Sequence, residues 1–262
     1  GVDLSKPHAP GVAEALRKAL AEHCVLCFSG QDIDNDDQIR FARIFGKADS
    51  EFLGKEQYNE YDFGDGPAKR GVLYISNLKE NGKNVGALPD GELHFHSDGA
   101  HRKSPYRATT LYAIEIPSIG GETRFANLQM AYDALPEAMK KRLDGAIVNN
   151  HYDTGAALRE QTDENDDKLS NARHPIVRVH PDSGRKSLFL GKLMTRNIIG
   201  MPRAESDALL EELFAHCEKP EFVYTHPWRV SDLLIWDNRS VNHARNWFPP
   251  EQRRHMRRVT VS

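Results

Sequence analysis

The sequence predicts a mainly β protein with flanking α-helices, organised as a single domain over residues 1–262. Short runs rich in Val, Ile, Thr, Tyr and Phe alternate with Gly, Pro, Asn and Asp, which is typical of strands joined by turns. Apolar residues at helical spacing are confined to a few segments, which predicts helices packed outside the strands. The 262 residues contain no repeat, linker or low-complexity segment that would divide them.

Five segments carry apolar residues at the spacing of one helix face. Gly46 ends the second segment, Asn127 can cap the third, and Pro136 suits the start of the fourth. In chain order, the predicted helices cover residues 12–23, 35–45, 130–135, 136–143 and 205–217.

Most remaining apolar runs have the length of strands. Residues 233–236 are apolar throughout, which predicts a strand buried on both faces. Asp182-Ser183-Gly184 predicts a hairpin turn between two short strands. The predicted strands cover residues 24–28, 71–77, 93–98, 107–116, 122–125, 145–151, 175–180, 186–190, 222–225, 233–236, 241–245 and 254–261.

Three polar segments interrupt these elements. Residues 51–70 predict irregular structure. Residues 78–91 contain three Gly, two Asn and one Pro, and predict either an ordinary surface loop or a mobile lid. Residues 153–173 predict a solvated insertion, because their acidic run lacks the Gly and Glu of a calcium-binding EF-hand loop.

Composition excludes several classes of protein. The formal net charge of −3 gives no general attraction to nucleic acid or to an anionic membrane. No apolar run is long enough to span a bilayer, and no segment at the start predicts a signal peptide. With three Cys, a disulfide framework is not expected, so we predict a cytoplasmic protein. We also expect a homo-oligomer.

Cys24 and Cys27 form a C-x-x-C motif within an apolar run. A buried strand explains them, because Cys there behaves as a small apolar residue. A zinc or redox site is the less favoured interpretation, since the sequence has no second Cys pair. Cys217 lies in a helical pattern and is expected in the core.

Residues 93–98, Leu-His-Phe-His-Ser-Asp, hold the first candidate metal ligands. Alternate side chains of an extended segment share a face, so His94, His96 and Asp98 are expected to point the same way. A third ligand from elsewhere would complete the two-His-one-carboxylate triad that suits Fe(II) and oxygen chemistry. A lone H-x-D is weak evidence, and His94 could compete with His96 as a ligand.

His243 is the best candidate for the third ligand, because it follows a buried strand and a tight turn. Near the end of the sequence, Arg254, Met256 and Arg258 share one strand face at a period of two. Two inward guanidiniums are costly unless an anion meets them, and guanidinium binds carboxylate through paired hydrogen bonds. The sequence therefore combines a redox-metal triad with a site for a carboxylate.

These features together resemble the taurine dioxygenase and dichlorophenoxyacetate dioxygenase (TauD/TfdA) family of Fe(II)/2-oxoglutarate-dependent oxygenases. The resemblance runs nearly end to end, and its motifs are specific jointly although each alone is weak. They are Gly1-Val2-Asp3-Leu4, Phe28-Ser29-Gly30-Gln31, Phe95-His96-Ser97-Asp98, Gly120-Gly121-Glu122-Thr123, Ala131-Tyr132-Asp133-Ala134-Leu135-Pro136, His174-Pro175-Ile176-Val177-Arg178, Gly184-Arg185-Lys186, Trp236-Asp237-Asn238-Arg239, His243 and the Arg254/Arg258 pair.

The resemblance implies a double-stranded β-helix, or jelly roll, and a dioxygenase that uses Fe(2+), O2 and 2-oxoglutarate as cosubstrate. It implies that His96, Asp98 and His243 bind iron. The reaction would hydroxylate a small organic anion, such as a sulfonate, aryloxyalkanoate or other carboxylate, with release of succinate and CO2.

The resemblance also implies roles for the other polar residues. Thr123 and Arg254 would hold the distal carboxylate of 2-oxoglutarate, and Arg258 would face the anionic group of the substrate. The sequence departs from the family around Phe95-His96-Ser97-Asp98, which His94 and His101 flank. Glu92 lies on the predicted face of His94, where it could contact a cationic substrate group or remain in solvent.

Three alternative functions stay open. A related iron oxygenase could desaturate or decarboxylate its substrate, whereas halogenation would need the position of Asp98 vacant. A non-catalytic jelly-roll protein could keep a structural metal, although structural zinc sites are usually closed and Cys-rich. The C-terminal Arg cluster could bind nucleic acid, with Arg253 and Arg257 as solvated charges; such binding would depend strongly on salt.

Overall fold

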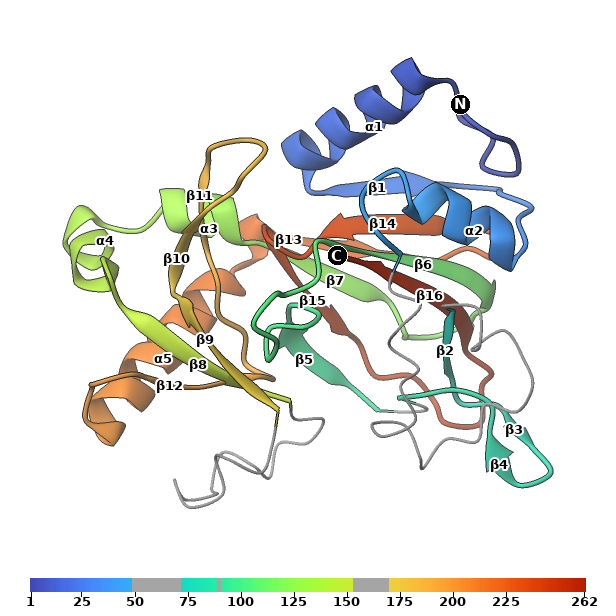
Figure 1. Cartoon of the computed structure of the whole chain (residues 1–262). Coiled ribbons are helices and arrows are strands. Elements are labelled where there is room, and N and C mark those ends of the chain that lie inside the picture. Colours follow the sequence, from blue (N-terminus) through green and yellow to red (C-terminus); the bar gives the residue numbers. More distant parts are fainter. Residues whose placement is uncertain (49–71, 89–90, 153–169) are drawn as a thin grey trace.

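The core of the protein is a sandwich of two antiparallel sheets (Figure 1), seen in a computed structural model that describes residues 1–48, 72–88, 91–152 and 170–262. The larger sheet has the strand order β1-β14-β6-β16-β2. Its strands are β1 (Val25–Phe28), β14 (Leu233–Asp237), β6 (Ala108–Glu115), β16 (His255–Val261) and β2 (Leu73–Ser76). The smaller sheet has the order β13-β7-β15-β5. Its strands are β13 (Val223–His226), β7 (Thr123–Asn127), β15 (Val241–Arg245) and β5 (Leu93–His96).

Strands far apart in the sequence are neighbours in both sheets. This arrangement is a jelly roll flanked by helices, as the sequence predicted. The packing of β14 explains why its residues 233–236 are all apolar. Leu233 and Ile235 pack on the N-terminal helices, whereas Leu234 and Trp236 pack between the two sheets. Both faces are buried, so the strand lacks the alternation of a half-exposed one.

Helices α1 (Pro10–His23) and α2 (Asn35–Ala42) cover the outer face of the larger sheet (Figure 1). Asp34 and Asp37 form a capping box that starts α2. Cys24 caps α1 with a left-handed backbone (φ 65°), so the strand expected at 24–28 begins one residue later. Cys24 is buried and Cys27 is exposed, which corrects the expectation that a buried strand holds both.

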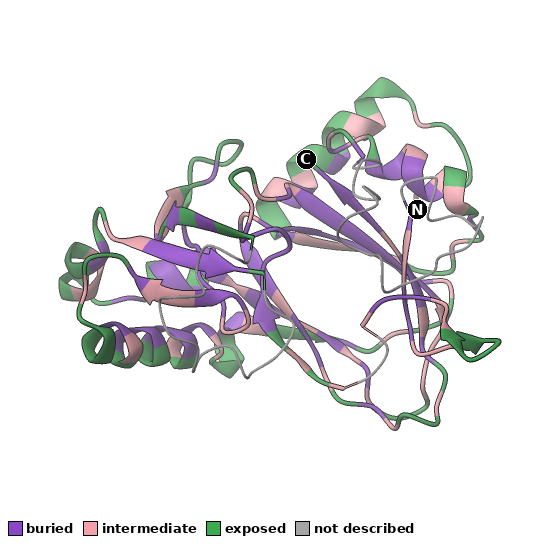
Figure 2. Ribbon diagram, turned by 60° about the horizontal axis from the view of Figure 1, so that its bottom comes forward, coloured by how far each residue is buried: buried purple, intermediate pink, exposed green. Residues whose placement is uncertain are grey.

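A second layer packs beside the sandwich around its own apolar core (Figure 2). Asn127 caps the first of its helices by accepting hydrogen bonds from two backbone amides, as predicted. The layer holds α3 (Leu128–Asp133), α4 (Glu137–Leu143), α5 (Arg203–Cys217), β8 (Ile147–His151), β9 (Asn171–Pro175), β10 (Val177–Val179), β11 (Lys186–Leu188), β12 (Thr195–Ile198) and the 3-10 turn η5 (Pro220–Phe222).

Most predicted elements are confirmed, and the hairpin around Asp182-Ser183-Gly184 joins β10 to β11. Strands β9 and β12 were not predicted, because their sequences are polar. The predicted loop at 78–91 contains a small hairpin, β3 (Lys79–Glu80) with β4 (Lys83–Asn84). Expectations for 51–70 and for most of 153–173 fall outside the described residues. Among described helices, none is long and apolar enough to cross a bilayer.

Candidate active site

Sheet register brings two of the predicted ligands together. Strands β5 and β15 are antiparallel neighbours, and His243 on β15 lies directly opposite His96 on β5. The two imidazole rings are 4.2 Å apart between centroids. Neither residue needs a special loop, because the pairing of the strands alone sets their separation.

A β-bulge changes the face of the residues before His96. His243 pairs with His96, but Arg245 pairs with Leu93, so β5 carries one extra residue between these pairs. Leu93 therefore lines the same pocket as His96, while His94 is exposed and does not line it. The expectation that His94 and His96 share a face is wrong for this reason.

Asp98 reaches the two imidazoles from a turn that follows the end of β5. Its carboxylate oxygens lie 3.9 Å from Nε2 of His96 and 3.8 Å from Nε2 of His243. One ligand atom from each of the three side chains lies within 4.8 Å of the other two. We call these three residues the inner cluster.

The protonation states of the inner cluster suit metal binding. Burial lowers the pKa of His96 and lowers that of His243 to about 3, so both imidazoles are neutral at pH 7. Burial also acts to raise the pKa of Asp98, but the charge of Arg258, together with the hydrogen bond from Thr109, helps to hold that pKa below its usual value. The cluster thus offers two neutral nitrogen ligands and one carboxylate.

Hydrogen bonds fix the orientation of the ligands. Nδ1 of His96 lies 2.8 Å from the carbonyl of His94, so Nδ1 carries the proton and Nε2 keeps a free lone pair. The hydroxyl of Thr109 donates to Asp98 at 2.7 Å and accepts from the side-chain amide of Asn238 at 2.9 Å. The indole of Trp236 donates to the same Asn238 at 3.0 Å.

A pocket opens beside the inner cluster, and all three remaining polar candidates from the resemblance line it. The lining residues are Ile75, Leu88, Leu93, His96, Leu111, Thr123, Trp236, His243, Ala244, Arg245, Arg254 and Arg258. The wall is thus largely apolar, with positive charge confined to arginines. Glu92 and His94 are exposed and lie outside this lining.

Arg254 is a buried cation in this pocket, with 2% of its surface exposed. Burial, aided by the charge of Arg245, lowers the pKa of Arg254 to about 9. Its Nε donates to the carbonyl of Gly121 at 3.3 Å. Gly121 has φ +72°, and a Cβ there would lie 3.3 Å from that Nε, so glycine permits this close approach.

Thr123, at the start of β7, is 3% exposed and faces the same pocket. The indole N–H of Trp228 donates to its hydroxyl oxygen at 3.0 Å. Because the oxygen accepts that bond, the hydroxyl proton of Thr123 is left to donate in another direction. Sequence reasoning did not identify Trp228, and no local pattern around it would have done so.

Arg258 and Arg245 have different positions at the pocket. Arg258 on β16 lies 3.4 Å from a carboxylate oxygen of Asp98, so it reaches the inner cluster itself. Arg245 donates to the carbonyls of Leu88 at 2.8 Å and Gly91 at 3.0 Å, which ties the end of the 78–91 loop to β15. A lid role for this loop stays a prediction.

The remaining C-terminal arginines do not form a solvated patch. Arg253 is exposed and pairs with Glu115 at 2.6 Å. Arg257 is 6% exposed and donates to the side chain of Gln38 at 2.6 Å and to the carbonyl of Ile33 at 2.8 Å. The expectation of a solvated Arg257 is wrong, because α2 covers that face of β16. His101 is buried edge-on against Tyr152.

The inner cluster fits a divalent iron ion. The donor set is two imidazole nitrogens and a carboxylate, the ligands of the facial triad that leaves coordination positions open. The neutral rings and the ionised carboxylate need no proton change at pH 7, and Nε2 of His96 already faces inward.

The sequence and the fold are similar to those of known proteins. Residues 1–260 match the model of the family described as taurine catabolism dioxygenase TauD, TfdA family. An alpha-ketoglutarate-dependent 2,4-dichlorophenoxyacetate dioxygenase of Burkholderia sp. (strain RASC) is 34% identical, over 97% of this chain and 86% of its own. An alkylsulfatase of Acinetobacter baylyi (strain ATCC 33305 / BD413 / ADP1) is 29% identical, over 100% and 80%. The crystal structure of AAD-2 in complex with Mn(II) and N-oxalylglycine superposes with a TM-score of 0.81 at 32% identity, over 100% of this chain and 92% of that one.

Proposed function

Because the chain belongs to the TauD, TfdA family of α-ketoglutarate-dependent dioxygenases, which use Fe(II) and 2-oxoglutarate, we propose that it hydroxylates a small organic anion with release of succinate and CO2. The family match over residues 1–260 supports the further proposal that the chain is one dioxygenase domain. Cytoplasmic location and homo-oligomeric assembly stay predictions from the sequence.

The inner cluster would hold the iron through Nε2 of His96, Nε2 of His243 and one oxygen of Asp98. When bound, Fe(II) supplies the activation of O2, with oxidative decarboxylation of 2-oxoglutarate as the source of electrons. The chain contributes ligand orientation through the hydrogen bonds to His96 and Asp98.

Arg254 and Thr123 would bind the distal carboxylate of 2-oxoglutarate. No carboxylate of the described residues neutralises Arg254, whose pKa is lowered first by burial and then by a second cation. Burial beside a second cation makes the charged form of Arg254 unfavourable. A bound carboxylate would offset that cost and accept paired hydrogen bonds from the guanidinium. The hydroxyl of Thr123, with its oxygen already accepting from Trp228, would donate to the same carboxylate.

Arg258 would select for an anionic substrate. It lies in the pocket and reaches Asp98, so a substrate anion paired with it is held next to the metal. The apolar wall would exclude water and accommodate the carbon skeleton. The names of the relatives, a dichlorophenoxyacetate dioxygenase and an alkylsulfatase, likewise point to organic anions.

The observation that carries the proposal is the meeting of the inner cluster and the buried Arg254 around one pocket. The test is a panel of sulfonates, aryloxyacids, alkyl sulfates, amino acids and quaternary amines, assayed for succinate formed in step with product. We expect turnover from the anions, and its loss in Arg258→Gln but not in Arg253→Gln, which removes an exposed arginine nearby. Turnover of cationic substrates alone would contradict the assignment of Arg258.

A further inference from the structure

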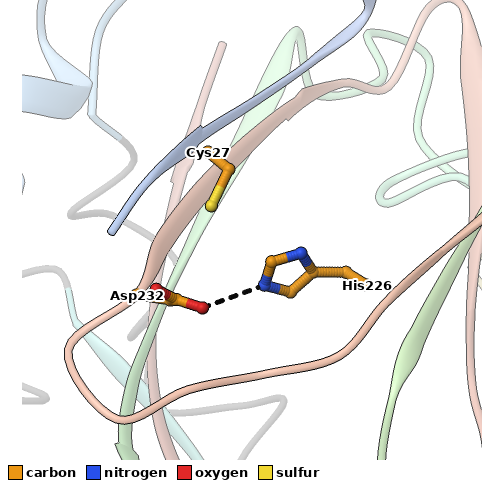
Figure 3. Close-up of side chains that lie close together, drawn as sticks. All are labelled: Cys27, His226 and Asp232. Atoms are coloured by element: carbon orange, nitrogen blue, oxygen red, sulfur yellow. Dashed lines mark hydrogen bonds and ion pairs between the residues drawn. The ribbon is translucent and has the colours of Figure 1, made fainter. Parts of the chain in front are cut away.

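A second group of metal-type ligands lies at the end of the sandwich where β1 and β13 form the edges of the two sheets. Cys27 comes from β1, His226 from β13, and Asp232 from the turn before β14. One ligand atom from each lies within 4.8 Å of the other two. Figure 3 shows the three side chains converging from separate segments. We call them the edge cluster.

His226 is buried and already oriented toward the carboxylate of Asp232. Its Nε2 lies 3.2 Å from Oδ2 of Asp232, and its Nδ1 lies 2.9 Å from the hydroxyl of Tyr224. Burial lowers the pKa of His226, outweighing the opposite effect of Asp232. The imidazole is therefore neutral at pH 7, as a metal ligand must be.

Asp232 supplies the observation that points beyond an ordinary His–Asp pair. Its Oδ2 accepts hydrogen bonds from His226 and from the backbone amide of Arg229. Its Oδ1 is buried and has no hydrogen-bond partner among the described residues, and the residue is only 2% exposed. An unsatisfied carboxylate oxygen at a buried position costs free energy, and a bound cation would remove that cost.

Cys27 gives solvent access to the cluster. The residue is exposed, and it also lines a groove of about 400 Å³ between the edge strands, together with Tyr224 and Val223. Its thiol lies 3.6 Å from the hydroxyl of Ser29. An ion can thus reach the thiol from solvent while the other two ligands stay buried.

We propose that the edge cluster binds a divalent ion of the zinc type through Cys27, His226 and Asp232. Sulfur, imidazole and carboxylate are all zinc ligands, and three protein ligands leave a fourth position for water. With bonds of about 2.0 to 2.3 Å, a tetrahedral ion separates its ligand atoms by roughly 3.5 Å, a spacing compatible with three ligand atoms that lie within 4.8 Å of one another. One thiolate, one carboxylate and a divalent ion sum to zero charge.

Protons balance as follows. The thiol of Cys27 loses its proton to solvent as the sulfur–metal bond forms. The proton of His226 moves from Nε2 to Nδ1, where it is donated to the oxygen of Tyr224, whose hydroxyl then ceases to donate to the ring. Binding one ion therefore releases one proton, and nothing is oxidised or reduced.

Co2+ is the probe that separates the edge cluster from the inner cluster. Only a cysteine ligand gives the near-ultraviolet thiolate-to-cobalt charge-transfer band, and the inner cluster has no cysteine. We expect the unmodified chain to bind Co2+ at both clusters and to show this band. In Cys27→Ser, the band disappears and the chain binds one ion fewer, with no change in fold because Cys27 is exposed.

Two further variants make the outcome decisive. His96→Ala should lose the ion of the inner cluster and keep the band. The band therefore reports on the edge cluster whether or not the inner cluster binds a metal ion. Cys24→Ala removes the buried cysteine of the C-x-x-C motif, whose thiol lies 3.9 Å from Gln129, and should keep the band. Absence of the band in the unmodified chain, or its persistence in Cys27→Ser, would leave only a His226–Asp232 hydrogen bond and overturn the proposal.

Discussion

The inner cluster and the edge cluster use similar residues in different settings. The inner cluster lies on the antiparallel pair β5 and β15 and on the turn after β5. His96 and Asp98 are buried, Thr109 donates a hydrogen bond to Asp98, and His96 donates one to the carbonyl of His94. The edge cluster joins two edge strands, and its thiol is exposed and protonated. The comparison indicates that the inner cluster, with neutral imidazoles and an ionised carboxylate, would bind a metal ion without releasing a proton, whereas the protonated thiol would make binding at the edge cluster depend on pH.

The largest loss of activity is expected when a ligand of the inner cluster is removed. His96→Ala is expected to abolish iron-dependent formation of succinate, because two ligands do not define a facial site. Succinate is measured with saturating Fe(II), 2-oxoglutarate and substrate. His23→Ala, which removes an exposed imidazole outside both clusters, should keep turnover. Full activity in His96→Ala would eliminate the inner cluster as the iron site.

Removal of the buried guanidinium should have the next largest effect. Arg254→Met is expected to weaken 2-oxoglutarate binding by about 2 to 5 kcal/mol, the range for loss of a buried charge pair. Calorimetric titration of the metal-loaded protein measures the change. Arg253→Met, which breaks only the exposed pair with Glu115, is the control. Equal effects of the two substitutions would show that Arg254 does not contact the cosubstrate.

The hydrogen bonds around the inner cluster can be tested separately. Thr109→Val keeps the shape of the side chain but removes the donor to Asp98, and should reduce Fe(II) affinity by about 10- to 100-fold. Equilibrium dialysis at pH 7 measures it. An unchanged affinity would mean that the strand register alone presets the geometry, and the contrast between the clusters would then rest only on burial.

The pH dependence of Co2+ binding should distinguish the clusters directly. Although Cys27 is exposed as a residue, partial desolvation of its thiol raises the pKa, so the thiol is protonated at neutral pH and must lose its proton on binding. The affinity of the edge cluster should therefore rise by about tenfold per pH unit below that pKa. His96→Ala isolates this signal. A flat profile would exclude a thiolate ligand.

The smallest expected effect concerns Trp228. Trp228→Phe keeps a ring beside His226 but removes the hydrogen bond to Thr123, which should weaken 2-oxoglutarate binding by about 0.5 to 1.5 kcal/mol. The change in KM for 2-oxoglutarate, with kcat preserved, is the measurement. A fall in kcat alone would indicate that Trp228 acts elsewhere.

The sequence predicts those parts of the site that local patterns encode. His96 and Asp98 lie two residues apart, and Arg254 and Arg258 have the spacing of one strand face, so local patterns made them candidates. The resemblance to the family was needed to choose His96 over His94. The extra residue in β5 could not be predicted, because bulges depend on the partner strand. It turns His94 outward.

Contacts between distant elements account for the remaining differences. Arg257 has the composition of a surface residue, and only the packing of α2 on β16 buries it. Cys27 has no second Cys pair nearby in the sequence, which made zinc the less favoured interpretation. Its partners His226 and Asp232 come from about 200 residues further along the chain, and no spacing rule connects them.

The buried charge of Arg254 has a consequence for the lifetime of the enzyme. A guanidinium held out of water with no counter-charge among the described residues weakens the folded state, and an anion that neutralises it stabilises that state alone. At a hundredfold excess over its dissociation constant, a ligand adds about 2.7 kcal/mol to the free energy of unfolding. When 2-oxoglutarate is scarce, the protein would unfold more often and be degraded faster by proteases. Its abundance would then depend on the supply of its cosubstrate.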